Sequence, residues 1–209
     1  MIICMCKIMC VTNRHICQED FVERIEGIAK SGVEAIILRE KDMTSEEYEA
    51  LAGKVIDICA KNNTMCILHN FTHVADRLSW DAIHLPMGVL RSLDEAKRRS
   101  YRILGASCHS VDEAVEAESL GCTYITAGHV FETYCKKGLE PRGVEFLGDV
   151  CKAVNIPVYG LGGINENNAP EVIKAGAEGV CIMSRFMSCP EPAEYIGRLT
   201  RKLRMDENE

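Results

Sequence analysis

Short apolar runs alternate with longer segments of helical periodicity along most of the chain. The runs Ala35-Ile36-Ile37-Leu38 and Gly179-Val180-Cys181-Ile182 are almost continuously apolar. Such runs are typical of parallel strands that are buried on both faces of a sheet. The pattern predicts strands at 2–12, 34–38, 65–69, 81–85, 102–107, 122–127, 157–161 and 178–183.

A segment with helical spacing follows each candidate strand. These segments are Glu19–Lys30, Ser45–Asn62, Thr72–Leu78, Leu93–Arg99, Val111–Leu120, Val144–Val154, Glu166–Ala175 and Glu191–Arg204. Successive βα units in this number predict a single-domain (β/α)8 TIM barrel of the α/β class, spanning 1–209. An open doubly wound sheet is the alternative, but no G-x-G-x-x-G motif follows the first candidate strand.

Composition narrows the class of partner. The formal net charge of −7 argues against nucleic acid or an acidic membrane surface as the main partner. No apolar run approaches the roughly 18 residues of a membrane helix, and the first ten residues lack the order of a signal peptide. The twelve cysteines include no C-x-x-C pair. We therefore expect a cytoplasmic protein whose cysteines are reduced and mostly buried, rather than disulfide-bonded or bound to metal.

The loop after the sixth candidate strand carries the clearest candidate chemistry. The apolar run Tyr124-Ile125-Thr126 leads into this loop, which contains His129, Thr133 and Lys136. Barrel enzymes place their chemistry at the carboxyl ends of the strands. A histidine there can move protons near neutral pH, and a lysine can hold an anion. We expect His129 to be catalytic and Thr133 and Lys136 to contact a phosphorylated small molecule.

Other candidate strand ends supply anion ligands. The seventh ends in a stretch containing Gly162 and Gly163, and the eighth ends in Met183-Ser184. Phosphate sites of (β/α)8 barrels are frequently built from the loops after these two strands, where backbone N–H groups can face the anion. The second strand ends in Arg39-Glu40-Lys41, whose two cations point to one side and are further substrate-binding candidates, with a solvated charge cluster as the alternative.

The remaining histidines at strand ends carry a weaker signal. His69 and His84 are expected in the core or in the wall of a pocket, and His109 or Ser110 is expected to cap the next helix. A metal site of His69, His84 and His109 is conceivable, but no acidic ligand accompanies these histidines. We expect no bound metal and no cofactor.

Several motifs together resemble one known family. They are Leu38-Arg39-Glu40-Lys41, His84-Leu85, Ser107-Cys108-His109-Ser110, the loop from Gly128 to Gly138, and Gly162-Gly163-Ile164-Asn165. In order and spacing they resemble the thiamine phosphate synthase superfamily over nearly the whole chain. Its two branches are the thiamine phosphate synthases and the thiazole tautomerases. The resemblance implies a (β/α)8 barrel that binds a thiazole phosphate with backbone amides after strands seven and eight.

Departures from the synthase pattern indicate the tautomerase branch. Synthases need Mg²⁺, held by two aspartates; here Asn70 takes the place of the first and an apolar residue that of the second. Ile37 replaces a synthase glutamine, and Gly128-His129 replaces the usual Gly-Pro of the strand-six loop. The sequence Gly-His-Val-Phe-Glu-Thr and the following Cys-Lys-Lys-Gly resemble the tautomerases.

This resemblance implies a thiazole tautomerase of thiamine biosynthesis. His129 would shift a proton to aromatise a carboxythiazole phosphate, while Arg39, Lys41 or Lys136 would hold its carboxylate. The alternatives are a Mg²⁺-dependent thiamine phosphate synthase and a non-catalytic regulator that binds thiazole or thiamine phosphates. The partner is a thiazole phosphate rather than nucleic acid or a membrane, and a homo-oligomer is compatible with the sequence.

Overall fold

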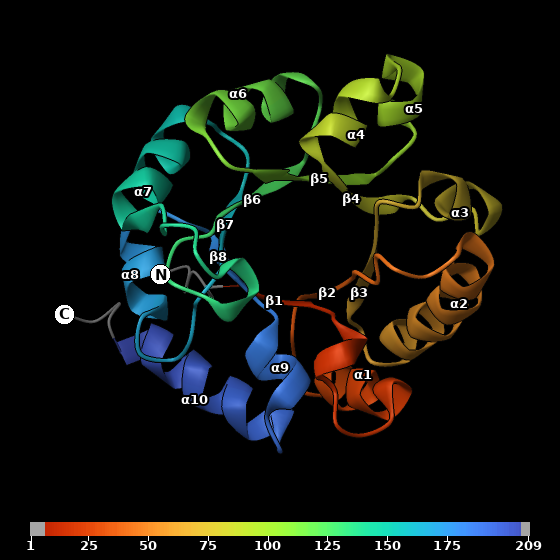
Figure 1. The fold of residues 1–209 in the computed structure, drawn as a ribbon, viewed down its shortest axis with the longest axis horizontal. Helices are drawn as coiled ribbons and strands as arrows, with labels where there is room; N and C mark the ends of the chain where they lie inside the picture. Colours follow the sequence, from red (N-terminus) through yellow and green to blue (C-terminus); the bar gives the residue numbers. More distant parts are fainter. Residues whose placement is uncertain (1–6, 206–209) are drawn as a thin grey trace.

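Eight parallel strands close into a barrel in the computed structural model, which describes residues 7–205 (Figure 1). Each strand pairs with the next along the chain, and the last returns to the first, so that Met9 is opposite Cys181. The strands are β1 (Lys7–Val11), β2 (Ala35–Leu38), β3 (Met65–His69), β4 (Ala82–Pro86), β5 (Ile103–Cys108), β6 (Tyr124–Gly128), β7 (Val158–Leu161) and β8 (Gly179–Ile182). The predicted (β/α)8 barrel is confirmed.

Helices form an outer ring around the strands (Figure 1). They are α1 (Phe21–Lys30), α2 (Ser45–Lys61), α3 (Thr72–Arg77), α4 (Met87–Ser92), α5 (Glu95–Arg99), α6 (Val111–Ser119), α7 (Gly143–Ala153), α8 (Ala169–Lys174), α9 (Ser184–Ser188) and α10 (Pro192–Met205), with 3-10 turns η1 (Arg14–Ile16) and η2 (Tyr134–Lys136). None of the helices within the described part of the chain is long and apolar enough to cross a membrane.

Most predicted elements are present within one or two residues of their expected ends, and the differences have local causes. The helix α4 was not expected, because Gly88 lies in it and it starts directly after Pro86. Burial of Met87 and Leu90 stabilises it in spite of this weak propensity. The predicted first strand is present from Lys7, while its part at 2–6 lies outside the described residues.

The side chains of the strands separate into two cores. One set points into the barrel and includes Met9, Ile37, Tyr124 and Cys181. Alternate residues point outward and pack with the helices in a larger core. Because side chains alternate along a strand, the last inward-facing residue of each strand reaches the carboxyl end of the barrel.

The cysteines mostly fill these cores. The cysteines whose side chains are described are free, and most are buried, as Cys10, Cys66 and Cys181 illustrate. Burial raises the pKa of the Cys181 thiol, so the protonated form is favoured. The expected burial holds for most of this set, whereas Cys4 and Cys6 lie outside the described residues.

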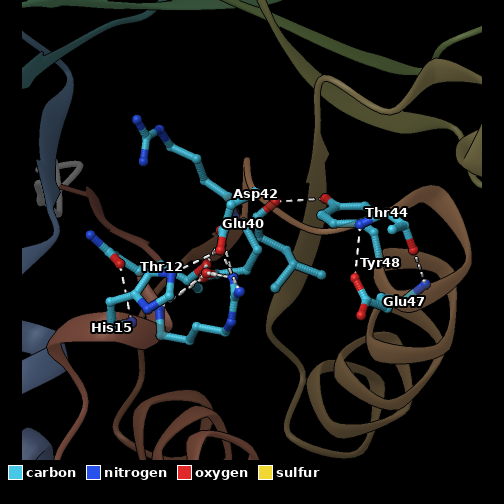
Figure 2. A network of polar contacts seen from close by, with 11 residues as sticks. Thr12, His15, Glu40, Asp42, Thr44, Glu47 and Tyr48 are labelled. Atoms are coloured by element: carbon cyan, nitrogen blue, oxygen red, sulfur yellow. Dashed lines mark hydrogen bonds and ion pairs between the residues drawn. The ribbon is translucent and has the colours of Figure 1, made fainter.

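Tyr48 joins the carboxyl ends of β2 and β3 (Figure 2). The residue lies in α2, whose first turn is capped by Thr44 and Glu47. Its hydroxyl donates to the carbonyl of Leu38 at 2.6 Å and accepts from the backbone N–H of His69 at 2.9 Å. The side chain is fully buried. Tyr48 therefore fixes the two strands at the points from which Arg39 and His69 emerge.

Candidate active site

A cavity of about 320 Å³ opens at the carboxyl ends of the strands. This volume is within the range of small-molecule sites. It is lined by all the predicted site residues except Lys41, namely Arg39, His129, Thr133, Lys136, Gly162, Gly163, Met183 and Ser184. Lys41 lies outside the lining, and partial burial together with the nearby charges of Arg39 and Lys136 lowers its pKa. The structure thus brings together residues that are up to 145 positions apart (184 minus 39).

The network around Glu40 explains why Arg39 faces the cavity (Figure 2). Glu40 is buried and accepts hydrogen bonds from the Thr12 hydroxyl at 2.6 Å and from the backbone N–H and guanidinium of Arg14. The backbone N–H of Arg39 donates to the same Thr12 oxygen at 2.9 Å. Because Glu40 is held on one side, its neighbour Arg39 points to the other, into the cavity.

The loop after β7 packs directly against the loop after β6. Val130 and Phe131 donate backbone hydrogen bonds to the carbonyls of Leu161 and Gly162, at 2.9 and 3.0 Å. Gly162 has φ +100°, and a Cβ atom there would lie 2.3 Å from Cβ of His129. Gly163 has φ +69° and would meet the Glu132 carbonyl at 2.5 Å. Glycine is therefore required at both positions by backbone conformation and by contact.

Two histidines, one following β5 and one following β6, lie beside the packed loops. His129 is 9% exposed, and its Nε2 donates to the carbonyl of Leu139 at 3.3 Å. His109 Nδ1 donates to the carbonyl of Gly128 at 2.8 Å, so its ring lies at the cavity. Ser110 alone caps α6, with its hydroxyl accepting from the Glu113 N–H. Of the two residues expected as a cap, the structure thus assigns that place to Ser110.

A polar floor, defined here as His69, His84, Ser107 and Thr126, closes the cavity on the side of β3 to β6. His84 Nδ1 lies 2.9 Å from the Tyr124 hydroxyl and Nε2 lies 2.8 Å from Ser107 Oγ. The Thr126 hydroxyl donates to Ser107 at 3.5 Å. The predicted placement of His69 and His84 in a pocket wall agrees with this geometry.

Burial keeps the two floor histidines neutral. It lowers the pKa of His69 to about 2, with contributions from His84, Arg39 and Lys41, and it lowers the pKa of His84 to about 3. An imidazole in the unfolded chain has a pKa near 6.5. Above pH 6.5 each histidine is neutral in both the folded and the unfolded state. Its contribution to the free energy of unfolding is therefore fully present there.

We expect the free energy of unfolding to fall as the pH drops below about 6.5. Below this pH, His69 and His84 bind protons in the unfolded state but stay neutral in the folded state. The free energy of unfolding therefore falls by about 1.4 kcal/mol per pH unit for each histidine until its folded pKa is reached. Urea unfolding at pH 7.5, 6.0 and 5.0 measures this, and His69→Gln should remove about half of the slope. A flat profile over this range would contradict the assignment of neutral histidines.

Comparison with known proteins identifies the family. The family model described as thiamine monophosphate synthase matches residues 8–186. The chain belongs to this family. A thiamine-phosphate synthase from Clostridium acetobutylicum is 32% identical over 184 residues, covering 87% of each chain. One from Caldanaerobacter subterraneus subsp. tengcongensis is 37% identical over 167 residues, covering 77% of this chain and 76% of the relative. The solved thiamine phosphate pyrophosphorylase from Pyrococcus furiosus is 27% identical, with a TM-score of 0.83 over 96% of each chain.

The comparison overturns the interpretation as a thiazole tautomerase. Relatives that match most of the chain are named thiamine-phosphate synthases. The expected superfamily is therefore confirmed, and the expected isomerase is wrong. The interpretation depended on the missing Mg²⁺ aspartates, on Ile37 and on the loop that carries His129. In the fold, Nε2 of this histidine is bound to the Leu139 carbonyl, an arrangement that suits a residue of the pocket wall.

The Mg²⁺ ion that synthases use does not fit the residues of this chain. Within residues 7–205, no three histidine, cysteine, aspartate or glutamate side chains are grouped to hold a metal. Asn70 has φ +70° and offers an amide, while Met87 and Val89 pack in or against the apolar core. Glu40 is already occupied by Thr12 and Arg14. Mg²⁺ binds mainly through carboxylates and substrate phosphates, and Glu132 is the single carboxylate among the described residues that line the cavity.

The sequence-based expectation missed part of the cavity wall. Ser107, Thr126, Leu161 and Cys181 line it, although none was predicted as a site residue. Alternation along the strands was the available signal, since Ser107 pairs with Thr126 and each points inward near a carboxyl end. Which of these positions reach the ligand depends on the strand register, and the sequence does not state it.

Proposed function

We propose that the protein is a thiamine-phosphate synthase, a transferase that joins an activated pyrimidine to a thiazole phosphate. One observation carries the proposal: a single cavity combines the glycine backbone after β7 with the cations Arg39 and Lys136, in a chain whose relatives bear this name. Gly162, Gly163, Met183 and Ser184 would hold the thiazole phosphate, since backbone N–H groups suit an anion.

The cations would act on the other substrate. In this transfer, the thiazole ring nitrogen forms a bond to the methylene carbon of the pyrimidine while the bond from that carbon to the pyrophosphate oxygen breaks. The electron pair leaves with the oxygen, so negative charge increases on the pyrophosphate. Arg39, Lys41 and Lys136 lie together and would stabilise that charge, with arginine offering bidentate hydrogen bonds. Thr133 and His129 would line the space in which the two rings meet.

A direct assay tests the proposal. The purified protein is incubated with the pyrimidine pyrophosphate and the thiazole phosphate, once with Mg²⁺ and once with EDTA, and thiamine phosphate is measured by chromatography. We expect product in both conditions, because no group of three metal-ligating side chains occurs among the described residues and three cations are present.

Two results would count against this view in different ways. No thiamine phosphate in either condition would overturn the transferase. Product only with Mg²⁺ would support the transferase and overturn the statement that the ion does not fit. Gly162→Ala is the matched negative control, since its methyl group would collide with His129 and distort the phosphate loop while the cations are kept.

A further inference from the structure

The four residues that follow β2 alternate in charge. They are Arg39, Glu40, Lys41 and Asp42. Arg39 lines the cavity, and Lys41 has Arg39 and Lys136 as its electrostatic neighbours. The two carboxylates would oppose an anion if they faced the same space as these cations. Among the described residues, the cavity lining includes neither Glu40 nor Asp42, so the carboxylates are held elsewhere.

Arg14 donates hydrogen bonds to both of these carboxylates, which are labelled in Figure 2. Its Nη1 lies 2.7 Å from Oδ1 of Asp42 and its Nη2 lies 2.5 Å from Oδ2. The same Nη1 donates to Oε2 of Glu40 at 3.2 Å, and the backbone N–H of Arg14 donates to that oxygen at 3.1 Å. Paired hydrogen bonds between a guanidinium and a carboxylate fix the two planar groups relative to each other.

These contacts connect the segment after β1 to the segment after β2. Arg14 and His15 form η1, where the Asn13 side chain accepts from the backbone N–H of His15 at 3.2 Å. The Glu40 side chain is 1% exposed and that of Asp42 is 53% exposed, so Arg14 reaches from a buried carboxylate to one at the surface. Hydrogen bonds from Arg14 and His15 hold the pKa of Asp42 well below its usual range, so this carboxylate is charged at neutral pH.

We infer that Arg14 is a positioning residue for the anion site. By binding Glu40 and Asp42 on the side of η1, it fixes the backbone from which Arg39 extends and keeps two negative charges away from the anion. Among the described residues, Arg14 is not part of the cavity lining, so it acts through Arg39 rather than by contact with the anion. The inference rests on the proposed function, in which Arg39 stabilises the charge of the leaving pyrophosphate.

Two probes separate positioning of this cation from a general structural role. Calorimetry with EDTA present measures inorganic pyrophosphate and thiazole phosphate on the wild type, on Arg14→Gln and on Arg14→Lys. We expect Arg14→Gln to weaken pyrophosphate binding about 5- to 20-fold, because Arg39 is kept but less well directed, and thiazole phosphate binding by less than about twofold. Arg14→Lys keeps the charge without the planar fork, so it should recover only part of the loss.

Arg91→Gln is the matched control. Arg91 in α4 makes a bidentate pair with Glu116 in α6, at 2.8 and 2.6 Å, and the cavity lining includes neither residue among those described. This variant removes the same charge and an ion pair of the same geometry. Both affinities should therefore stay within about twofold of the wild type, because a distant exposed charge is screened by salt.

The outcomes distinguish the inference from the proposed function. Unchanged pyrophosphate binding by Arg14→Gln, an equal loss for both ligands, or full recovery by Arg14→Lys would each overturn the inference alone. If Arg14→Gln does not fold, Arg14→Lys decides: weaker binding confined to pyrophosphate supports the inference, and wild-type affinity for both ligands overturns it. Failure of the wild type to bind either ligand would overturn the proposed function as well.

Discussion

Replacing Gly162 by alanine is expected to reduce the affinity for thiazole phosphate by at least about 100-fold. The new methyl group would lie 2.3 Å from Cβ and 2.8 Å from Cα of His129, so the loops after β6 and β7 must separate. The residue would also be held at φ +100°, which alanine tolerates poorly. Together the strain and the overpacking should cost roughly 2–5 kcal/mol of unfolding free energy. Calorimetric titration and urea unfolding measure the two effects.

Gly121→Ala separates the effect of contact from that of conformation. Gly121 has φ +90° at the end of α6, but a Cβ there meets nothing within 4 Å. This variant should lose only about 1–2 kcal/mol of stability and should bind thiazole phosphate as the wild type does. If both variants bind normally, the packing of the β6 loop on Gly162 does not shape the phosphate site.

Replacing Arg39 by glutamine is expected to weaken the binding of inorganic pyrophosphate about 10- to 100-fold. Arg39 faces the cavity with Lys41 and Lys136 close by, whereas the carboxylate of Glu40 is turned away and bonded to Thr12. Loss of charge-assisted hydrogen bonds to an anion typically costs about 1.5–2.8 kcal/mol, which corresponds to this range. The measurement is calorimetry with EDTA present, so that the protein's own cations are tested.

A second lysine in the same loop provides the control. Lys137→Gln removes the same charge one residue from Lys136, at a position that does not line the cavity. It should change the affinity less than about threefold at 0.15 M salt, because exposed charges are screened. Arg39→Lys should recover part of the loss through its charge but not the bidentate geometry. Equal losses for Arg39→Gln and Lys137→Gln would show that only the net charge of the rim matters.

The strands and most of the helices followed from the sequence because their signals are local. Apolar runs such as Ala35–Leu38 specify buried strands wherever they lie in the chain. The helix α4 did not follow, because it depends on the burial of Met87 and Leu90 rather than on propensity. The segment expected as a helix from Glu166 begins only at Ala169, since Asn168 first bonds the turn at Gly163 and Asn165.

The candidate site divides in the same way. Gly162, Gly163 and Arg39 could be named in advance because each follows a buried strand at a barrel end, where ligands bind. The branch of the family could not be named in advance. The missing aspartates, Ile37 and the loop around His129 indicated an isomerase, while the relatives are named synthases. Residue types in one loop do not define a reaction without the groups that face them.

By itself, the sequence determined the barrel, the family and the strand ends at which the ligand groups stand. Tertiary structure decided which of these groups meet. It turned Glu40 away to Thr12 and Arg14, used both nitrogens of His84 within the protein, and left the His69 ring facing the cavity. The physical reason is that periodicity is a property of neighbouring residues, whereas hydrogen-bond partners and burial depend on strand register across the closed barrel.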